Sequence, residues 1–231
     1  MSEFVTHKIE KDFYCIEQDF VRAFLLIGEK EALLIDTGLG GGGLKDCVEQ
    51  ITKLPVTVVF THADGDHVGG AAEFENRRMH PSEMDYYQSR HENAVSVKPI
   101  WEGDSIELGS YSFEVILVPG HTPGSIVLLE KNRRFLIGGD SMQNGPIYMF
   151  GVGRNFEAYL SSMKKLQARI PEFDRIFSSH GELVLQPEII FRLHDAAEKV
   201  MEKKLQGSPE TLWENFTMNC YRTDGVAFYA V

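Results

Sequence analysis

A single short stretch of the chain, Thr61-His-Ala-Asp-Gly-Asp-His67, carries two histidines and two aspartates within six positions. It follows residues 56–60, a β-branched run that predicts a buried strand. On a helix these side chains would point in several directions, but a tight loop centred on Gly65 can bring them together. Imidazole and carboxylate groups suit zinc, iron or manganese, whereas structural zinc sites favour thiolates. The stretch therefore predicts a metal site, and the alternative is a charged surface loop with incidental histidines.

Four further positions repeat this arrangement of a metal-ligand type of residue after an apolar strand. Asp36 follows residues 32–35, and His121 lies in Val118-Pro-Gly-His-Thr-Pro-Gly124. Asp140 follows Ile137-Gly-Gly, and His180 follows Ile176-Phe-Ser-Ser. Because strand ends often meet at one edge of a domain, we expect all five elements to form one dinuclear metal site. Such a site indicates a metal-dependent hydrolase.

The elements that must position these residues can be read from hydrophobic spacing and turn residues. Helices are expected over residues 44–52, 81–90 (with Ser82 as the cap), 155–170 and 187–205, with a helix beginning at 71–74. Strands are expected over residues 24–27, 32–36, 56–60, 106–108, 111–118, 126–130, 135–137, 175–178, 216–221 and 226–231. Residues 24–36 and 126–140 share one plan, a strand pair followed by an aspartate, which suggests a domain built from two similar halves.

Length and composition limit the class of protein. The chain has 231 residues, enough for one domain or two tightly joined halves, and its 43% hydrophobic content is ordinary for a soluble protein. No run approaches the roughly 18 apolar residues of a membrane span. Residues 1–12 carry charges and lack an apolar signal core, so we expect a cytoplasmic protein with no membrane partner. Three cysteines without paired spacing (Cys15, Cys47 and Cys220) predict buried thiols, not disulfides.

The net charge of −11 argues against a nucleic-acid partner, because nucleic-acid-binding surfaces are normally basic. A small-molecule substrate is expected instead, and the oligomeric state is left open. The glycine-rich residues 38–43 lack the Gly-Lys-Ser/Thr ending of a phosphate loop, so we expect a flexible loop beside the site. His7, His80, His91 and His194 lack such strand-end surroundings and are expected to be surface or capping histidines.

The ordered set of strand-end residues resembles the metallo-β-lactamase-fold superfamily over about residues 20–185. The resemblance implies an α/β (α+β) fold, a four-layer αβ/βα sandwich forming a single domain over 1–231, with two metal ions at one edge. It implies that Asp140 bridges the ions and that Asp36 supports the site loops through hydrogen bonds. The remaining ligands would be His62, Asp64 and His121 for the first ion, and Asp66, His67 and His180 for the second.

Asp64 departs from the pattern of that superfamily, most of whose hydrolases have histidine there, so the motif is HxDxDH where HxHxDH is usual. If Asp64 binds a metal ion, the site contains three carboxylates, which favours metals with oxygen preference. The alternative is that Asp64 turns away and forms hydrogen bonds within the loop. Two divalent ions are therefore expected, zinc first, with iron or manganese as alternatives.

The expected reaction is attack of a hydroxide, held between two metal ions, on a carbonyl carbon or a phosphorus atom. By family analogy, Asp66 would orient the nucleophile and carry a proton to the leaving group. Around the site, Thr61, Thr122, Ser141 and Ser179 are candidates for holding the ligands in place. Three aromatic residues (Tyr148, Phe150 and Phe156) could form an apolar substrate wall, or pack against a neighbouring helix, and Arg154 could bind an anionic group.

The expected substrate is a small ester, thioester, lactone or phosphoester. Glutathione-thioester hydrolases share the Gly-His-Thr-Pro-Gly stretch, although they have histidine at the position of Asp64. A second class is a di-iron oxidoreductase related to flavodiiron proteins, which carry a carboxylate, typically glutamate, at that position. A third is a metal-binding module without catalysis.

Overall fold

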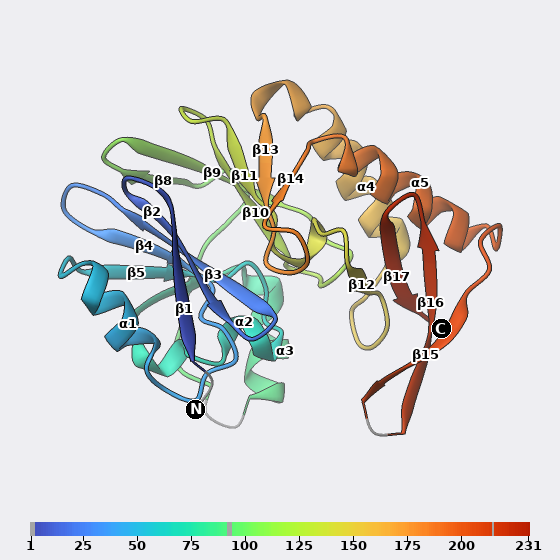
Figure 1. Ribbon diagram of the computed structural model, residues 1–231, viewed down its shortest axis with the longest axis horizontal. Coiled ribbons are helices and arrows are strands. Elements are labelled where there is room, and N and C mark those ends of the chain that lie inside the picture. Colours follow the sequence, from blue (N-terminus) through green and yellow to red (C-terminus); the bar gives the residue numbers. More distant parts are fainter. Residues whose placement is uncertain (1–2, 92–93, 214) are drawn as a thin grey trace. The chain divides into compact units, whose positions relative to one another are not determined.

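A computed structural model describes residues 3–91, 94–213 and 215–231, and its ribbon is drawn in Figure 1. The chain divides into two compact units. Unit 1 comprises Met1–Ile116 and Leu128–Arg133, and unit 2 comprises Leu117–Val127 and Arg134–Val231. The single domain expected over 1–231 stays a prediction, and each unit is described by itself.

Unit 1 contains a seven-stranded sheet whose strands follow one another in chain order. They are β1 (Phe4–Glu10), β2 (Phe13–Gln18), β3 (Val21–Ile27), β4 (Ala32–Ile35), β5 (Val56–Val59), β6 (Asn76–Met79) and β7 (Lys98–Pro99). The first four strands pair antiparallel, and β4 to β7 pair parallel. Ile35 lies opposite Val59 in the parallel pair of β4 and β5. The residues that follow these two strands therefore emerge at the same edge of the sheet.

The apolar residues of this sheet form a core with those of the helices of unit 1, α1 (Leu44–Ile51) and α3 (Pro81–Arg90) among them. The predicted cap of α3 is wrong. His80 is the N-cap, and its Nδ1 accepts a hydrogen bond from the backbone N–H of Ser82. Pro81 occupies the first helical position, so the cap is His80, two residues earlier than Ser82. His80 is therefore a capping histidine, one of the two roles expected for it from the sequence.

Short elements complete unit 1. The helix α2 (Gly65–Val68) lies within the histidine loop, and residues 71–74 form only a 3₁₀ turn, Ala71–Glu73, before the chain becomes extended at Phe74. The hairpin of β8 (Ser105–Leu108) and β9 (Tyr111–Leu117) agrees with the prediction. The strands β9 and β10 (Ile126–Glu130) each contain residues of both units.

In unit 2, β11 (Phe135–Ile137) runs parallel to β13 (Arg175–Phe177), which pairs antiparallel with β14 (Val184–Leu185). A separate four-stranded sheet has the order β12 (Pro146–Tyr148), β17 (Val226–Ala230), β16 (Phe216–Thr223) and β15 (Ser208–Trp213). The sequence analysis did not predict β15, which contains Pro209. Its place at the edge of the sheet explains why the proline is tolerated there.

Two helices of unit 2, α4 (Phe156–Gln167) and α5 (Ile189–Met201), run side by side, and α5 contacts β16 and β17 (Figure 1). Both are shorter than predicted. Asn155 is the N-cap of α4, and its side chain accepts a hydrogen bond from the N–H of Ala158. Among the described residues, no helix has the length and apolar character needed to cross a membrane.

Candidate metal centre

Asp36, which follows β4, accepts hydrogen bonds from Thr61 and His67, next to the candidate ligands of unit 1. Its carboxylate is buried and accepts three hydrogen bonds. The backbone N–H of Thr61 donates to Oδ1 at 2.7 Å, and the hydroxyl of Thr61 donates to Oδ2 at 2.7 Å. The Nδ1–H of His67 donates to Oδ2 at 2.8 Å. Asp36 therefore makes the loop-supporting hydrogen bonds that the resemblance implied, at the edge where β4 and β5 end side by side.

These contacts fix which nitrogen of each histidine can bind a metal ion. His67 uses Nδ1 for Asp36, which leaves Nε2 as its ligand atom. The Thr61 hydroxyl donates to Asp36, so it accepts from the Nδ1–H of His62 at 3.0 Å, and Nε2 of His62 is left as well. The tautomers are assigned from this network. Asp36 thereby orients both histidines, one directly and one through Thr61.

Residues of α3 and its C-cap also hold the loop formed by residues 61–67. These contacts were not predicted from the sequence. The buried carboxylate of Glu83 accepts a hydrogen bond from the N–H of Ala63 at 2.8 Å. His91 donates from Nε2 to the carbonyl oxygen of Ala63 at 3.0 Å. A glutamate on the buried side of a helix was the signal available in the sequence, because such a residue is seldom buried without a partner.

Asp64 has a different environment on each carboxylate oxygen. Oδ1 accepts a hydrogen bond from the phenol of Tyr86, on α3, at 2.9 Å. Oδ2 lies 3.6 Å from Nε2 of His62, the atom expected to bind a metal ion. Asp64 thus forms a hydrogen bond outside its loop while one oxygen stays beside the ligand atom of His62.

The glycine-rich loop 38–43 is held by defined contacts, although a flexible loop was expected. The buried side chain of Gln18 donates to the carbonyl of Gly40 and accepts from the N–H of Leu39, both at 2.8 Å. A Cβ on Gly40, whose φ is +83°, would lie 2.5 Å from the carbonyl oxygen of Gly69. Glycine at position 40 lets this loop approach the end of α2, two residues after His67.

Unit 2 brings its three candidate ligands together from two parallel strands and a turn. Asp140 follows β11 and His180 follows β13, and Ile137 lies opposite Phe177 in these strands. His121 lies in the turn after β9, where Gly120 has φ +147° and a Cβ would clash with Tyr159 at 2.5 Å. The Nδ1–H of His121 donates to the carbonyl oxygen of Tyr148 at 3.0 Å, which leaves Nε2 as its ligand atom.

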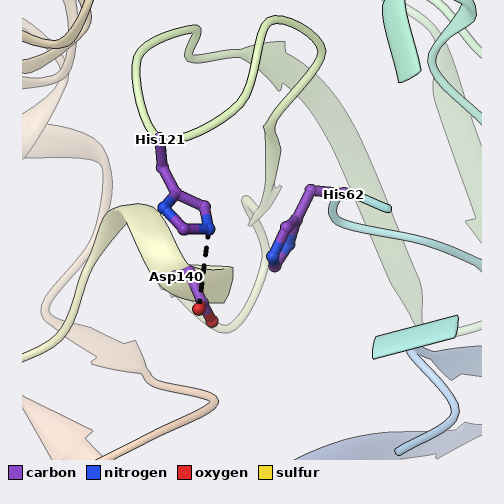
Figure 2. Close-up of side chains that lie close together, drawn as sticks. All are labelled: His62, His121 and Asp140. Carbon is purple, nitrogen blue, oxygen red and sulfur yellow. Dashed lines mark ion pairs between the residues drawn. The ribbon is translucent and has the colours of Figure 1, made fainter. Parts of the chain in front are cut away.

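The two oxygens of Asp140 face different histidines. Oδ2 lies 3.7 Å from Nε2 of His121, the pair that Figure 2 marks with a dashed line. Oδ1 lies 3.2 Å from Nε2 of His180. A carboxylate placed in this way can bridge two metal ions.

The spacing of the ligand atoms fits a bound divalent ion. Metal–nitrogen and metal–oxygen bonds of zinc are about 2.0–2.2 Å, so neighbouring ligand atoms on a tetrahedral ion lie about 3.3–3.6 Å apart. In unit 1, His67 Nε2 lies 3.6 Å from Oδ2 of Asp66, as His62 does from Asp64. These separations, and the two at Asp140, range from 3.2 to 3.7 Å. Three of the four separations are longer than ordinary N–H···O hydrogen bonds, and all four are close to the expected ligand spacing.

The hydroxyl groups proposed to support the ligands have different roles. Thr61 contacts Asp36 and His62, as expected. Thr122 contacts the hydroxyl of Ser125 at 2.6 Å and stabilises the turn that follows His121. Near His180 the supporting hydroxyl is that of Ser178, which donates to the His180 carbonyl at 2.7 Å. The sequence analysis chose the adjacent Ser179.

Two residues suggested for substrate contact lie close to α4. Phe156 packs edge-on against Phe228 with ring centroids 5.4 Å apart, which fits the packing alternative. Arg154 donates from its guanidinium to the carbonyl of Val152 at 3.1 Å. Tyr148, in contrast, is exposed.

Comparison with known proteins was made on the sequence and on the fold. A family model, the metallo-beta-lactamase superfamily, matches residues 16–180. The fold is similar to that of a metallo-beta-lactamase from Pontibacter korlensis, with a TM-score of 0.73, 16% identity, and coverage of 85% of this chain and 99% of that one. The predicted α/β fold of the metallo-β-lactamase type is confirmed.

Three relatives have informative names. The probable metallo-hydrolase YqgX of Bacillus subtilis (strain 168) is 27% identical over 177 residues, 69% of this chain and 84% of that protein. The acyl-coenzyme A thioesterase MBLAC2 of Homo sapiens is 26% identical over 183 residues, 62% and 66% of the two chains. A hydroxyacylglutathione hydrolase of Yersinia enterocolitica is 30% identical over 156 residues, 66% and 58%. Since the family model matches well over half of its length, the chain belongs to the metallo-beta-lactamase superfamily.

Proposed function

We propose that this protein is a hydrolase that binds two divalent metal ions. His62, Asp64 and His121 would hold the first ion, Asp66, His67 and His180 would hold the second, and Asp140 would contribute to both. Two groups of candidate ligands support this assignment, His62 with His121 and Asp140, and Asp66 with His67 and His180. Figure 2 draws the first group.

The observation that carries the proposal is the position of Asp140. Its two oxygens lie 3.7 and 3.2 Å from the Nε2 atoms of His121 and His180. A carboxylate serving one ion alone has no need of a histidine beside each oxygen, whereas a bridging carboxylate gives one oxygen to each ion. The side chain of Asp140 is only 13% exposed, so bound ions would also offset the cost of burying its charge.

The chain's own residues would position the reacting groups. Bound divalent ions supply Lewis acidity and lower the pKa of water toward neutral pH. Asp66, whose side chain is 22% exposed, is reachable by solvent, whereas His67 beside it is fully buried. By analogy with the family, Asp66 would orient the attacking water through its carboxylate and carry the proton to the leaving group. Asp36 and Thr61 keep the imidazoles in the tautomer that presents Nε2.

The proposed substrate is a small ester, thioester, lactone or phosphoester. The names of two relatives, an acyl-coenzyme A thioesterase and a hydroxyacylglutathione hydrolase, support an acyl thioester before the other three classes. The net charge of −11 supports a small molecule over a nucleic acid.

The test combines metal analysis with a substrate panel. Protein purified without added metal is analysed by inductively coupled plasma mass spectrometry and assayed against a thioester, a lactone, a phosphodiester and a β-lactam. We expect two ions per chain, zinc first, with thioester turnover that a chelator abolishes and zinc restores. Two bound ions without hydrolysis of any substrate would contradict the catalytic proposal and favour a metal-binding module.

One observation favours a second candidate function, a di-iron oxidoreductase. The Oδ2 of Asp64 lies beside Nε2 of His62, and two histidines with one carboxylate are a ligand set that non-haem iron enzymes use. Iron as the native metal, with oxygen consumption and no hydrolysis, would establish this function in place of the first. Zinc as the native metal would exclude it.

A further inference from the structure

One face of the four-stranded sheet in unit 2 carries aromatic side chains that its helices do not cover. Along β12 the side chains alternate, and Ile147 is buried while Tyr148 is 38% exposed. Phe228, the register partner of Ile147, packs against Phe156 and Tyr159 of α4 with ring centroids 5.4 and 5.5 Å apart. The face bearing Ile147 is thus the one that the helices cover, and Tyr148 is on the other.

Four residues on this second face form what we call the aromatic face: Tyr148, Phe150, Trp213 and Phe216. The rings of Trp213 and Phe216 are stacked, with centroids 4.7 Å apart and planes 5° apart. Phe150 connects the two ends of the group, lying 5.4 Å from Tyr148 and 5.4 Å from Phe216. Trp213 is 52% exposed, so a large apolar surface continues from β12 to the hairpin of β15 and β16.

The aromatic face begins at a residue that holds a proposed metal ligand. The carbonyl oxygen of Tyr148 accepts the hydrogen bond from Nδ1 of His121 at 3.0 Å. The backbone of Tyr148 therefore orients a ligand, while its side chain begins the apolar surface. A substrate whose reactive carbon lies at the metal centre would have its apolar part within reach of these rings.

Charge determines which kind of group suits this surface. On β15 and β16, which carry Trp213 and Phe216, the charged side chains of Glu210 and Arg222 pair with each other at 2.8 Å, and the phenol of Tyr229 also donates to Glu210 at 2.8 Å. The four rings themselves are uncharged, so they favour a hydrocarbon over a charged group. A second copy of the chain fits less well, because two chains of net charge −11 repel each other.

We infer that the aromatic face binds the hydrocarbon acyl chain of the substrate, which makes medium-chain acyl thioesters or esters the preferred substrates. This inference rests on the proposed hydrolase function. Removing one methylene group from water raises affinity about fourfold when it is fully buried, and an open face covers a chain on one side only. We therefore expect kcat/KM to rise about twofold for each added methylene.

The test uses the full zinc-loaded chain and a series of N-acetylcysteamine thioesters from acetyl to decanoyl. The wild type should show the rise with chain length, and Trp213→Ala should flatten it while turnover of the acetyl thioester stays within about twofold. Trp213→Phe, which keeps an aromatic ring, should retain most of the slope. The matched control is Trp101→Ala, because Trp101 is 53% exposed and lies in unit 1, and it should keep the wild-type slope.

A binding experiment separates failure of this inference from failure of the hydrolase proposal. Trp101→Phe leaves Trp213 as the single tryptophan, so its fluorescence reports on the aromatic face. Decanoate should change this emission in a saturable way, and acetate should not. Binding without turnover would overturn the hydrolase function alone. Turnover with a flat chain-length profile would overturn the acyl-chain site, as would a dimer that Trp213→Ala dissociates without changing the profile.

Discussion

The phenol of Tyr86 donates a 2.9 Å hydrogen bond to Oδ1 of Asp64, whose other oxygen lies 3.6 Å from Nε2 of His62. A tyrosine on α3 therefore holds the carboxylate of Asp64, the residue at which we expect the motif to depart from that of the superfamily. Hydrogen bonds to the outer oxygen of a ligating carboxylate hold the inner oxygen in position. The pair gives a test of whether Tyr86 supports zinc binding through Asp64.

Tyr86→Phe should weaken zinc binding about tenfold, because outer partners of metal ligands contribute on that scale. Affinity is measured by competition with a chromophoric chelator. In an Asp64→Ala background the same substitution should have no further effect, since Tyr86 acts through Asp64. Tyr87→Phe is the control on the same helix. The Tyr87 hydroxyl accepts a hydrogen bond from the N–H of Val95, which is outside residues 61–67. Equal losses in both backgrounds would show that Tyr86 does not act through Asp64, and an Asp64→Ala protein with wild-type zinc affinity would show that Asp64 is not a ligand.

Asp36→Asn should lower both zinc affinity and stability. Asparagine tolerates the left-handed backbone of this position, φ +61°, so the substitution changes the carboxylate and not the chain path. Its amide group must face Thr61 or His67, which both donate, and one donor is left without an acceptor. We expect about 1–3 kcal/mol lower stability of the metal-free protein in urea unfolding. An unchanged zinc affinity would argue against the orienting role of Asp36.

Asp66→Asn should lower kcat by about 10²–10⁴-fold, the usual contribution of a positioned acid or base. Asparagine keeps an oxygen beside Nε2 of His67 but cannot accept the proton. Metal content is measured on the same sample by mass spectrometry, since loss of the second ion would also abolish turnover. Near-normal turnover with both ions bound would exclude Asp66 from proton transfer.

His80 should make the stability of the protein depend on pH. Burial lowers the pKa of its imidazole from the usual 6.5, because desolvation disfavours the charged form. Since the unfolded chain binds the proton more tightly, the stabilising contribution is complete above about pH 6.5 and is lost as the pH falls below it. His80→Asn keeps an acceptor for the N–H of Ser82 and removes the titration.

The measurement is urea unfolding of wild type and His80→Asn from pH 7.5 to 5. Below about pH 6.5 the wild type should lose stability more steeply, by at most about 1.4 kcal/mol per pH unit for one proton. His7→Asn is the control, because His7 is exposed and pairs with Glu17. Parallel curves for wild type and His80→Asn would contradict the prediction.

The sequence predicted the strands that end at candidate ligands because each combines a compact apolar run with a distinctive residue directly after it. The pairs β4 with Asp36 and β13 with His180 are examples. The predictions were poorer where tertiary contacts decide the outcome. The strand β15 forms despite Pro209 because the sheet edge tolerates it, and His80 caps α3 because Pro81 begins the helix.

The contacts of α3 and its C-cap with residues 61–67 could not be predicted from the sequence either. Glu83, Tyr86 and His91 are about 20 to 30 positions from the residues they hold, and no local periodicity connects them to Ala63 and Asp64. These side chains contact Ala63 and Asp64 only because the tertiary fold packs α3 beside that loop. The same limit applies to Tyr148, whose backbone oxygen and not its ring contacts His121.

Substitutions of Asp36 and Asp64 would differ in how many candidate ligands they disturb. Asp36 serves His67 directly and His62 through Thr61, so a change there disturbs two ligands at once. Asp64 accepts a hydrogen bond from Tyr86, so a change there first disturbs a single candidate ligand. If Asp64 binds a metal ion, one substitution at position 64 can change metal preference while the two histidines keep their orientation. A substitution at position 36 would change the orientation of both histidines before it changed any preference.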